Sequence, residues 1–135
     1  MTKEQKKIIL VDDNNSNLTA CKKILKSYYE VYTVPSAEKM FDLLKHVIPD
    51  MILLDVEMPD MNGYEAAAAL KKNAAYRDIP IVFLSGQFDP VIIAEGLNLG
   101  ALDFIQKPVI SALLLKRIET YLVLIDYEKG LKNGK

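Results

Sequence analysis

The stretch Ile52–Gly63, ILLDVEMPDMNG, places an acidic residue directly after an apolar run. The run is typical of a buried β-strand, and Asp55 ends it. An ionised carboxylate at the edge of a hydrophobic core is costly unless it is paired or bound to a cation. Asp55 is therefore either a hydrogen-bonded cap or a functional group. Pro59 and Gly63 predict a turn beside it.

The composition is that of an ordinary globular domain. The 135 residues suit one domain, with 50% hydrophobic residues, 26% charged residues and a formal net charge of −1. This balance gives no electrostatic support for nucleic-acid or membrane binding. No apolar run is long enough to span a bilayer, the N-terminus lacks a signal-peptide core, and Cys21 is the only cysteine. We expect a cytoplasmic protein that binds neither nucleic acid nor membrane directly.

Short apolar segments alternate with helical patterns along the whole chain. The segments rich in β-branched or aromatic residues predict strands at Lys7–Val11, Met51–Leu54, Ile79–Leu84 and Leu102–Ile105, with a weaker one at Val31–Val34. Between and after them, apolar residues recur at helical spacing. The predicted inward faces are Leu18, Cys21, Ile24, Leu25 and Tyr28; Met40, Phe41, Leu44 and Val47; Tyr64, Ala67 and Leu70; Val91, Ala94 and Leu97; and Leu114, Leu115, Ile118, Tyr121, Leu122 and Ile125.

This alternation predicts an α/β fold with a parallel sheet and helices on both faces. Five units fit the flavodoxin-like, doubly wound (βα)5 fold with strand order 2-1-3-4-5. Its functional crevice lies at the carboxyl ends of the first and third strands, where Asp12, Asp13 and Asp55 would meet. The predicted domain covers residues 7–128, between an N-terminal tail at 1–6 and a disordered C-terminal tail at 129–135.

Three neighbouring carboxylates favour a hard dication. They repel one another and raise the pKa of at least one group unless a cation joins them, and Mg²⁺ suits such oxygen ligands. Asp55 could then attack phosphorus as a nucleophile and form an aspartyl phosphate. Ser85 follows the predicted strand Ile79–Leu84, and Lys107 comes just after the predicted strand Leu102–Ile105. The Ser85 hydroxyl and the Lys107 ammonium group are thus placed to compensate the added charge.

Four ordered motifs make the chain similar to the receiver domain of two-component response regulators. They are ILVDDNNSN (9–17), ILLDVEMPDMNGYE (52–65), IVFLSG (81–86) and GALDFIQKP (100–108). The resemblance extends from about Lys7 to Tyr121. It implies that Asp55 accepts a phosphoryl group from a histidine kinase or a histidine phosphotransfer protein.

The resemblance also implies roles for the neighbouring residues. Asp12, Asp13, Asp55 and the backbone carbonyl of Glu57 would hold Mg²⁺, while Ser85 and Lys107 would bind phosphoryl oxygens. The side chain of Phe104 would change rotamer with phosphorylation, and a cis peptide bond is expected between Lys107 and Pro108. Glu57 and Gln87, two residues beyond Asp55 and Ser85, lie where receivers tune the lifetime of the phosphoryl group. The sequence leaves open whether Glu57 orients water or repels phosphoryl oxygens.

The last predicted helix carries more apolar residues than one buried face requires. Leu113, Val123 and Leu124 lie off its inward stripe. Receivers commonly associate through the fourth helix, fifth strand and fifth helix, so these residues form a candidate surface for a homodimer or a downstream effector. The helix is also similar to the junction in response regulators that carry a cyclic-di-GMP phosphodiesterase or synthase domain. The chain is thus either a free-standing receiver or the receiver portion of a longer protein with a C-terminal output domain.

Three other readings compete with a phosphorylated switch. An aspartate-nucleophile phosphatase of the haloacid-dehalogenase kind would place a second acid two residues after the nucleophile, which Glu57 fits only superficially, and would need a cap domain. A receiver-like binding module that is never phosphorylated would not need the full set of acidic, hydroxyl and lysine residues. A flavodoxin would need a phosphate-binding loop in place of DDNNSN. We expect a signalling switch whose chemistry acts on its own Asp55, and not an enzyme with a separate substrate.

Overall fold

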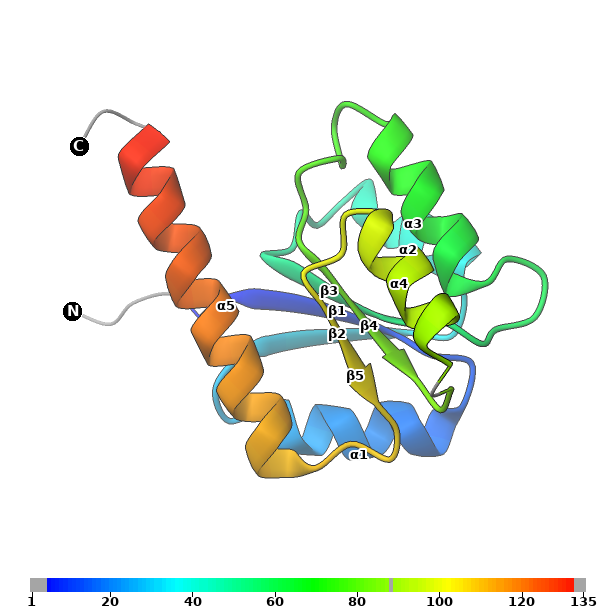
Figure 1. The fold of residues 1–135 in the computed structure, drawn as a ribbon. Helices are drawn as coiled ribbons and strands as arrows, with labels where there is room; N and C mark the ends of the chain where they lie inside the picture. Colours follow the sequence, from blue (N-terminus) through cyan, green and yellow to red (C-terminus); the bar gives the residue numbers. More distant parts are fainter. Residues whose placement is uncertain (1–4, 88, 133–135) are drawn as a thin grey trace.

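A parallel sheet of five strands in the order β2-β1-β3-β4-β5 forms the centre of the computed structural model, which describes residues 5–87 and 89–132 (Figure 1). The sequence-based prediction of the fold class and strand order is confirmed. The strands are β1 (Lys7–Val11), β2 (Glu30–Val34), β3 (Met51–Asp55), β4 (Ile81–Ser85) and β5 (Asp103–Gln106).

Five helices connect or follow the strands, and most begin at a side chain that caps them. They are α1 (Asn15–Leu25), α2 (Ala37–Leu44), α3 (Gly63–Lys72), α4 (Pro90–Asn98) and α5 (Ser111–Lys132). The side chains of Asn14, Ser36, Asn62 and Asp89 accept hydrogen bonds from first-turn N–H groups of α1 to α4. Asn62 and Glu65 complete a reciprocal capping box on α3.

The sheet separates two hydrophobic cores. Helices α1 and α5 cover one face, where Leu18, Leu25, Leu114 and Ile118 pack against alternate strand residues; α2, α3 and α4 lie over the other face (Figure 1). Every residue of β3 and β4 is buried. These strands are covered on both sides, which explains why they read as continuous apolar runs.

The predicted inward-facing residues are wrong in two places, at Tyr28 and along α4. Tyr28 follows the end of α1, and its side chain is 60% exposed. In α4, the predicted inward face of Val91, Ala94 and Leu97 points to solvent, with Val91 76% exposed.

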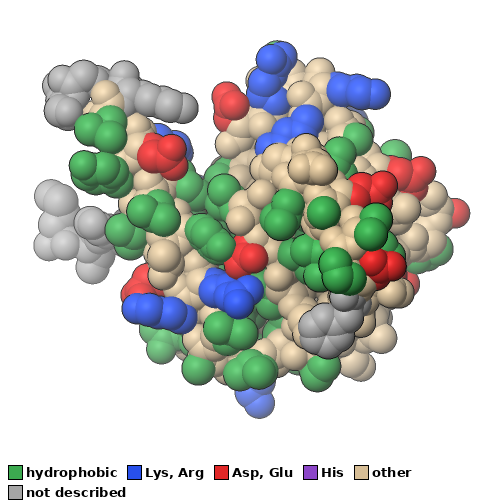
Figure 2. Space-filling view, in the orientation of Figure 1, with side chains coloured by type: hydrophobic (Ala, Val, Ile, Leu, Met, Phe, Trp, Pro, Cys, Tyr) green, Lys and Arg blue, Asp and Glu red, His purple; other side chains and the backbone are tan. Residues whose placement is uncertain are grey.

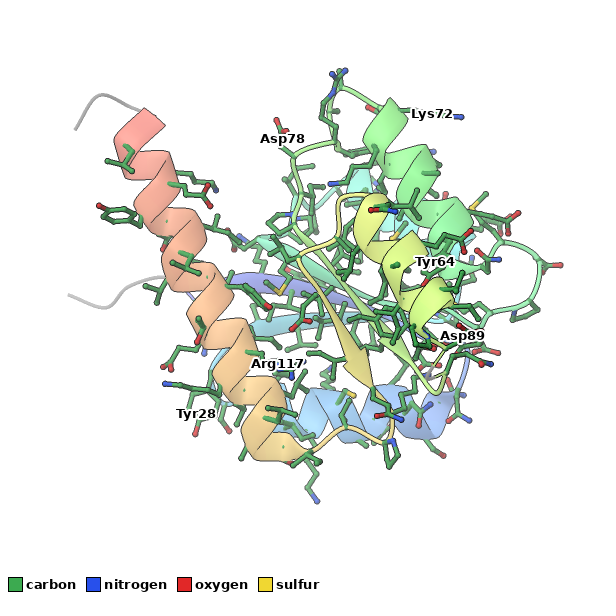
Figure 3. All side chains as sticks on the ribbon, viewed as in Figure 1. Tyr28, Tyr64, Lys72, Asp78, Asp89 and Arg117 are labelled. Atoms are coloured by element: carbon green, nitrogen blue, oxygen red, sulfur yellow. The ribbon has the colours of Figure 1, made fainter. Side chains whose placement is uncertain are left out.

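Tyr64 explains the orientation of α4. Its side chain lies beside α4, its hydroxyl donates a hydrogen bond to the Ile92 carbonyl, and a Cβ atom at Gly96 would lie 2.8 Å from the Tyr64 hydroxyl oxygen (Figure 3). Gly96 is the buried residue of the helix. The helix therefore turns its glycine toward the Tyr64 ring, and its larger side chains at Val91 and Leu97 remain outside.

The end of the chain also differs from the prediction. Helix α5 continues to Lys132, so residues 129–132, expected in a disordered tail, are helical because they continue the hydrogen-bonded turns of α5. Residues 1–4 and 133–135 of the two predicted tails lie outside the described residues, and β1 begins at Lys7. Within the described ranges, no helix combines the length and the apolar character needed to cross a membrane.

Candidate functional site

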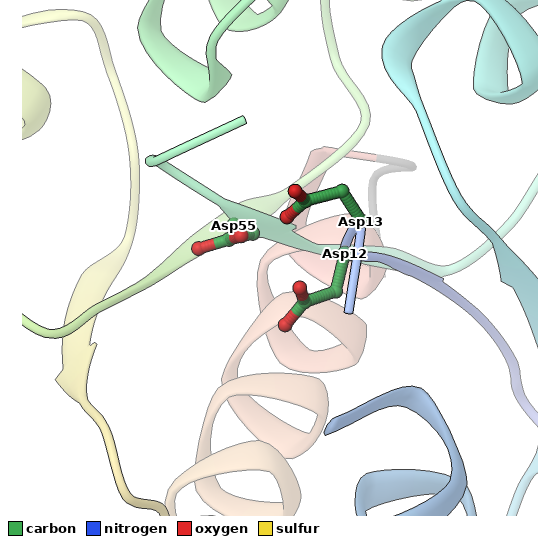
Figure 4. Close-up of side chains that lie close together, drawn as sticks. All are labelled: Asp12, Asp13 and Asp55. Atoms are coloured by element: carbon green, nitrogen blue, oxygen red, sulfur yellow. The ribbon is translucent and has the colours of Figure 1, made fainter. Parts of the chain in front are cut away.

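The sheet order brings the predicted acidic residues together. Strands β1 and β3 are neighbours, with Val11 opposite Leu54, so the residues that follow Val11 and Leu54 meet at the carboxyl edge of the sheet. One carboxylate oxygen from each of Asp12, Asp13 and Asp55 lies within 4.8 Å of the others, and Figure 4 shows the three side chains close together. We call these three residues the acidic cluster. Asp12 and Asp55 are buried, whereas Asp13 is exposed to solvent.

Lys107 inserts its ammonium group between the two buried carboxylates. Its Nζ atom lies 2.8 Å from Asp55 Oδ1 and 3.0 Å from Asp12 Oδ2. The Lys107 backbone N–H donates to the Ser85 carbonyl at 2.7 Å, which fixes the end of β5 beside β4. The peptide bond between Lys107 and Pro108 is cis, as the resemblance to receiver domains implied. Lys107 is the cation that compensates the cluster in the part of the chain that the structure describes.

The surroundings of Asp55 bring the pKa of its carboxyl group close to neutral pH. The pKa of Asp55 is raised from 3.8 to about 7 by the sum of opposing effects: burial raises it most, the hydrogen bond from Lys107 lowers it, and the neighbouring Asp12 charge raises it. Burial alone would lower the pKa of Lys107, but its hydrogen bonds to Asp55 and Asp12 outweigh burial and raise that pKa. One ammonium group therefore does not fully compensate the acidic cluster.

The donor set of the cluster fits a magnesium ion. All three side chains offer carboxylate oxygens, the ligands that Mg²⁺ prefers, and the exposed Asp13 leaves one side open for the water molecules that Mg²⁺ usually retains. Burial and the Asp12 charge both raise the pKa of Asp55, and a second positive charge would offset both effects. The predicted ligand role of the Glu57 backbone carbonyl stays a prediction.

Ser85 lies at the same edge of the sheet, but its hydroxyl is directed to Glu57. Ser85 is fully buried, and its Oγ donates to Glu57 Oε2 at 2.5 Å. The other carboxylate oxygen, Glu57 Oε1, accepts the Gly86 N–H at 3.2 Å. The Gln87 N–H in turn donates to Ser85 Oγ at 2.9 Å. The sequence singled out Glu57, Ser85 and Gln87, but not the contact between Glu57 and Ser85. The available signal was the position of Glu57, two residues past the end of β3, next to the hydroxyl of Ser85 at the end of the neighbouring strand β4.

Phe104 belongs to a row of aromatic rings under α4. It is partly buried, and its ring centroid lies 6.3 Å from that of Phe83. The Phe83 ring meets Tyr64 edge-on at 4.9 Å, and the Tyr64 hydroxyl bonds to α4. Phe104 is thus linked to α4 through the rings of Phe83 and Tyr64. The change of the Phe104 rotamer stays a prediction. The side chain of Gln87 is exposed at the rim of the site.

Comparison with known proteins gives consistent matches. The family model described as the response regulator receiver domain matches residues 8–119. A probable cyclic di-GMP phosphodiesterase of Vibrio cholerae is 36% identical over 115 residues, which cover 85% of this chain and 26% of that protein. The response regulator PleD of Caulobacter vibrioides is 35% identical over 118 residues, covering 84% of this chain and 25% of that protein. The chain thus spans about a quarter of the length of these two relatives.

Solved structures agree with the sequence matches. A CheY-like response regulator receiver domain protein from Methanospirillum hungatei superposes with a TM-score of 0.85 at 28% identity, covering 93% of this chain and 99% of that one. The chemotaxis protein CheY4 of Vibrio cholerae gives a TM-score of 0.81 at 29% identity, with 86% and 98% of the two chains covered.

Proposed function

This chain belongs to the response regulator receiver domain family, and from that premise we propose that Asp55 is the residue that accepts the phosphoryl group. The donor in this proposal is a phosphohistidine on a histidine kinase or a histidine phosphotransfer protein in the cytoplasm. The observation that carries the assignment is the environment of Asp55. Its buried carboxylate lies 2.8 Å from the Lys107 ammonium group and within 4.8 Å of a carboxylate oxygen of each of the other two members of the acidic cluster.

The proposed reaction uses Asp55 as a nucleophile. A carboxylate oxygen of ionised Asp55 forms a bond to phosphorus while the bond from phosphorus to the histidine nitrogen breaks, and the electron pair of that bond stays on nitrogen. Lys107, already hydrogen-bonded to Asp55, compensates the charge that arrives with the phosphoryl group. Bound Mg²⁺, held by Asp12, Asp13, Asp55 and the Glu57 carbonyl, would supply further positive charge to the phosphoryl oxygens.

Phosphorylation would then act as a switch. The phosphoryl group carries roughly −1.5 to −2 units of charge at the carboxyl edge of the sheet, in place of the single negative charge of ionised Asp55. In the proposed active state, Ser85 and Lys107 contact phosphoryl oxygens, and Phe104 turns inward beside Phe83. Because these contacts exist only with the phosphoryl group present, they shift the population toward the active state. Gln87 and Glu57 are the proposed determinants of how long the state persists.

The first test is Mg²⁺-dependent phosphorylation by a small donor. Incubation with acetyl phosphate should add the mass of one phosphoryl group to the intact protein in the presence of Mg²⁺. The gain should be lost in EDTA and in Asp55→Asn. Steady release of phosphate from a phosphomonoester would instead support the phosphatase alternative, while an unmodified wild type that also fails to bind beryllofluoride would support a binding module that is never phosphorylated.

The proposed output surface comprises α4, β5 and α5. Figure 2 shows hydrophobic side chains over α4 and α5, and the exposed ones include Val91, Leu97 and Leu113. Between the two helices, Arg117 of α5 pairs with Asp103 of β5 at 3.1 Å; Arg117 is labelled in Figure 3. We propose that this surface binds a second copy, a separate effector, or a C-terminal output domain of a longer regulator. The output-domain alternative is supported by the length of two relatives, of which this chain spans about a quarter, and by the name of one of them, a probable cyclic di-GMP phosphodiesterase.

Light scattering with size-exclusion chromatography tests the homodimer. We expect a monomer with Mg²⁺ alone and a dimer when beryllofluoride is added, because the active state would change the affinity of this surface for a second copy. Val91→Asp should prevent the dimer by placing a charge on the apolar part of the surface. The matched variant Ile48→Asp, at another exposed apolar side chain, should leave it unchanged. A protein that stays monomeric under both conditions would refute the homodimer and leave the effector or output domain as the partner.

A further inference from the structure

The contacts of Glu57 assign it a function beyond a general effect on phosphoryl lifetime. Its two carboxylate oxygens accept hydrogen bonds from Ser85 Oγ at 2.5 Å and from the Gly86 N–H at 3.2 Å. Both donors belong to residues 85–87, which we call the Ser85 turn. One anionic group of the protein thus gathers two donors next to Asp55, where the phosphoryl group would arrive.

We propose that Glu57 is a positioning residue that holds the Ser85 turn in the unphosphorylated state and competes with the phosphoryl group for these two donors. This inference rests on the proposed function of Asp55. In the unphosphorylated protein, the Glu57 carboxylate occupies the place of the phosphoryl oxygens as hydrogen-bond acceptor. Phosphorylation therefore has to break the Glu57 contacts before Ser85 can bind the phosphoryl group.

The hydrogen-bonding capacity of Ser85 makes this competition exclusive. A serine hydroxyl has one proton to donate. The Gln87 N–H already donates to Ser85 Oγ at 2.9 Å, so the lone-pair side of the oxygen faces its own turn and the proton faces Glu57. Ser85 cannot donate to Glu57 and to a phosphoryl oxygen at the same time.

Charge and space favour a displacement of Glu57 on phosphorylation. The incoming group carries negative charge and repels the Glu57 carboxylate, two residues from Asp55 along the chain. A Cβ atom built at Gly86 would meet no atom within 4 Å, so the Ser85 turn has open space in which to rearrange. Ser85 itself is buried, and its hydroxyl needs a new acceptor as soon as Glu57 leaves.

The test measures beryllofluoride affinity in four proteins. Beryllofluoride would be titrated by calorimetry at constant Mg²⁺ into wild type, Glu57→Gln, Ser85→Ala and the double variant. We expect Glu57→Gln to bind about tenfold more tightly, because it loses a charge-assisted contact that opposes the bound state. In the Ser85→Ala background the same substitution should change the affinity by less than about threefold, since the competition for the hydroxyl is gone. Glu38→Gln removes an exposed negative charge from α2, outside the site and the proposed output surface, and should leave the affinity unchanged.

Amide hydrogen exchange tests the contact without any ligand. The Gly86 amide of the unphosphorylated protein should exchange about tenfold faster in Glu57→Gln than in wild type, because its charged acceptor is lost. Unchanged exchange together with unchanged affinity would overturn the inference, and an equal gain in affinity with and without Ser85 would reduce Glu57 to a repelling charge. A wild type that binds no beryllofluoride would instead refute the proposed function, and this inference with it.

Discussion

Replacing Gly63 with alanine is expected to destabilise the protein by about 3 kcal/mol and to weaken Mg²⁺ binding together with it. A Cβ atom at position 63 would lie 2.3 Å from the Asp55 carbonyl oxygen and 2.9 Å from the Val56 Cα atom. Both are backbone atoms, so no side-chain rotation can relieve the clash. The Gly63 N–H also donates to the Val56 carbonyl at 2.9 Å, which closes the loop after β3 against the strand end. A displaced Asp55 backbone would move the acidic cluster as well.

Urea denaturation and Mg²⁺ calorimetry measure the two effects. Gly130→Ala is the matched control, because a Cβ atom there meets nothing within 4 Å, and helix propensity predicts a stability equal to or slightly above wild type. If Gly63→Ala has wild-type stability and wild-type Mg²⁺ affinity, the close approach between α3 and the end of β3 does not constrain the site.

The second large effect is expected for Lys107→Met in the absence of Mg²⁺. This substitution keeps an unbranched chain but removes the ammonium group that contacts Asp12 and Asp55. At pH 8 in EDTA we expect a loss of about 3 kcal/mol, since breaking a buried pair leaves uncompensated charge. Saturating Mg²⁺ should recover a large part of the loss, because a bound dication stabilises the folded state and compensates the same carboxylates.

The loss should be smaller at pH 5, and the pKa of Asp55 gives the sign. Its folded-state pKa is raised from 3.8 to about 7, so the protonated form is favoured in the folded protein. Stability linked to this group is therefore present below its unfolded pKa and declines as pH rises toward 7. Removing Lys107 raises that pKa further. The variant therefore loses stability through ionised Asp55 mainly above neutral pH. The pKa of Lys107 is itself raised, which keeps the wild-type ammonium group charged throughout this window.

Lys116→Met controls for the loss of a surface lysine. Lys116 is exposed on α5, and its pair with Glu119 spans 3.8 Å on the surface, so its loss should change stability by less than about 1 kcal/mol. A Lys107→Met variant that loses the same stability at pH 5 and pH 8, with no recovery in Mg²⁺, would show that packing of the lysine chain matters and its charge does not.

The sequence was sufficient for the fold because its local signals agree. Buried runs such as Ile52–Leu54 have no helical period, the cap residues Ser36 and Asp89 stand at helix starts, and the alternation of elements permits few topologies. The strand order alone determines where a residue directly after a strand, such as Asp12, lies at the edge of the sheet. This is why the structure brings the acidic cluster and Lys107 together as the sequence predicts.

Features that depend on contacts between elements were not predictable from periodicity. The orientation of α4 follows from the fit of Gly96 against Tyr64, two residues that are far apart in sequence and carry no joint pattern. The direction of the Ser85 hydroxyl depends on a side-chain rotamer and on its competition between acceptors. The sequence identifies the polar residues near Ser85, but only the three-dimensional packing decides which of them form hydrogen bonds with it.

Phosphorylation of Asp55 is tested by locating the phosphoryl group on the chain. The protein would be phosphorylated with acetyl phosphate and Mg²⁺, reduced with borohydride, which converts an aspartyl phosphate to homoserine, and digested for peptide mass spectrometry. We expect homoserine at position 55 and unmodified aspartate at positions 12 and 13. Homoserine at either of those two residues, with Asp55 intact, would contradict the assignment of Asp55 as the acceptor.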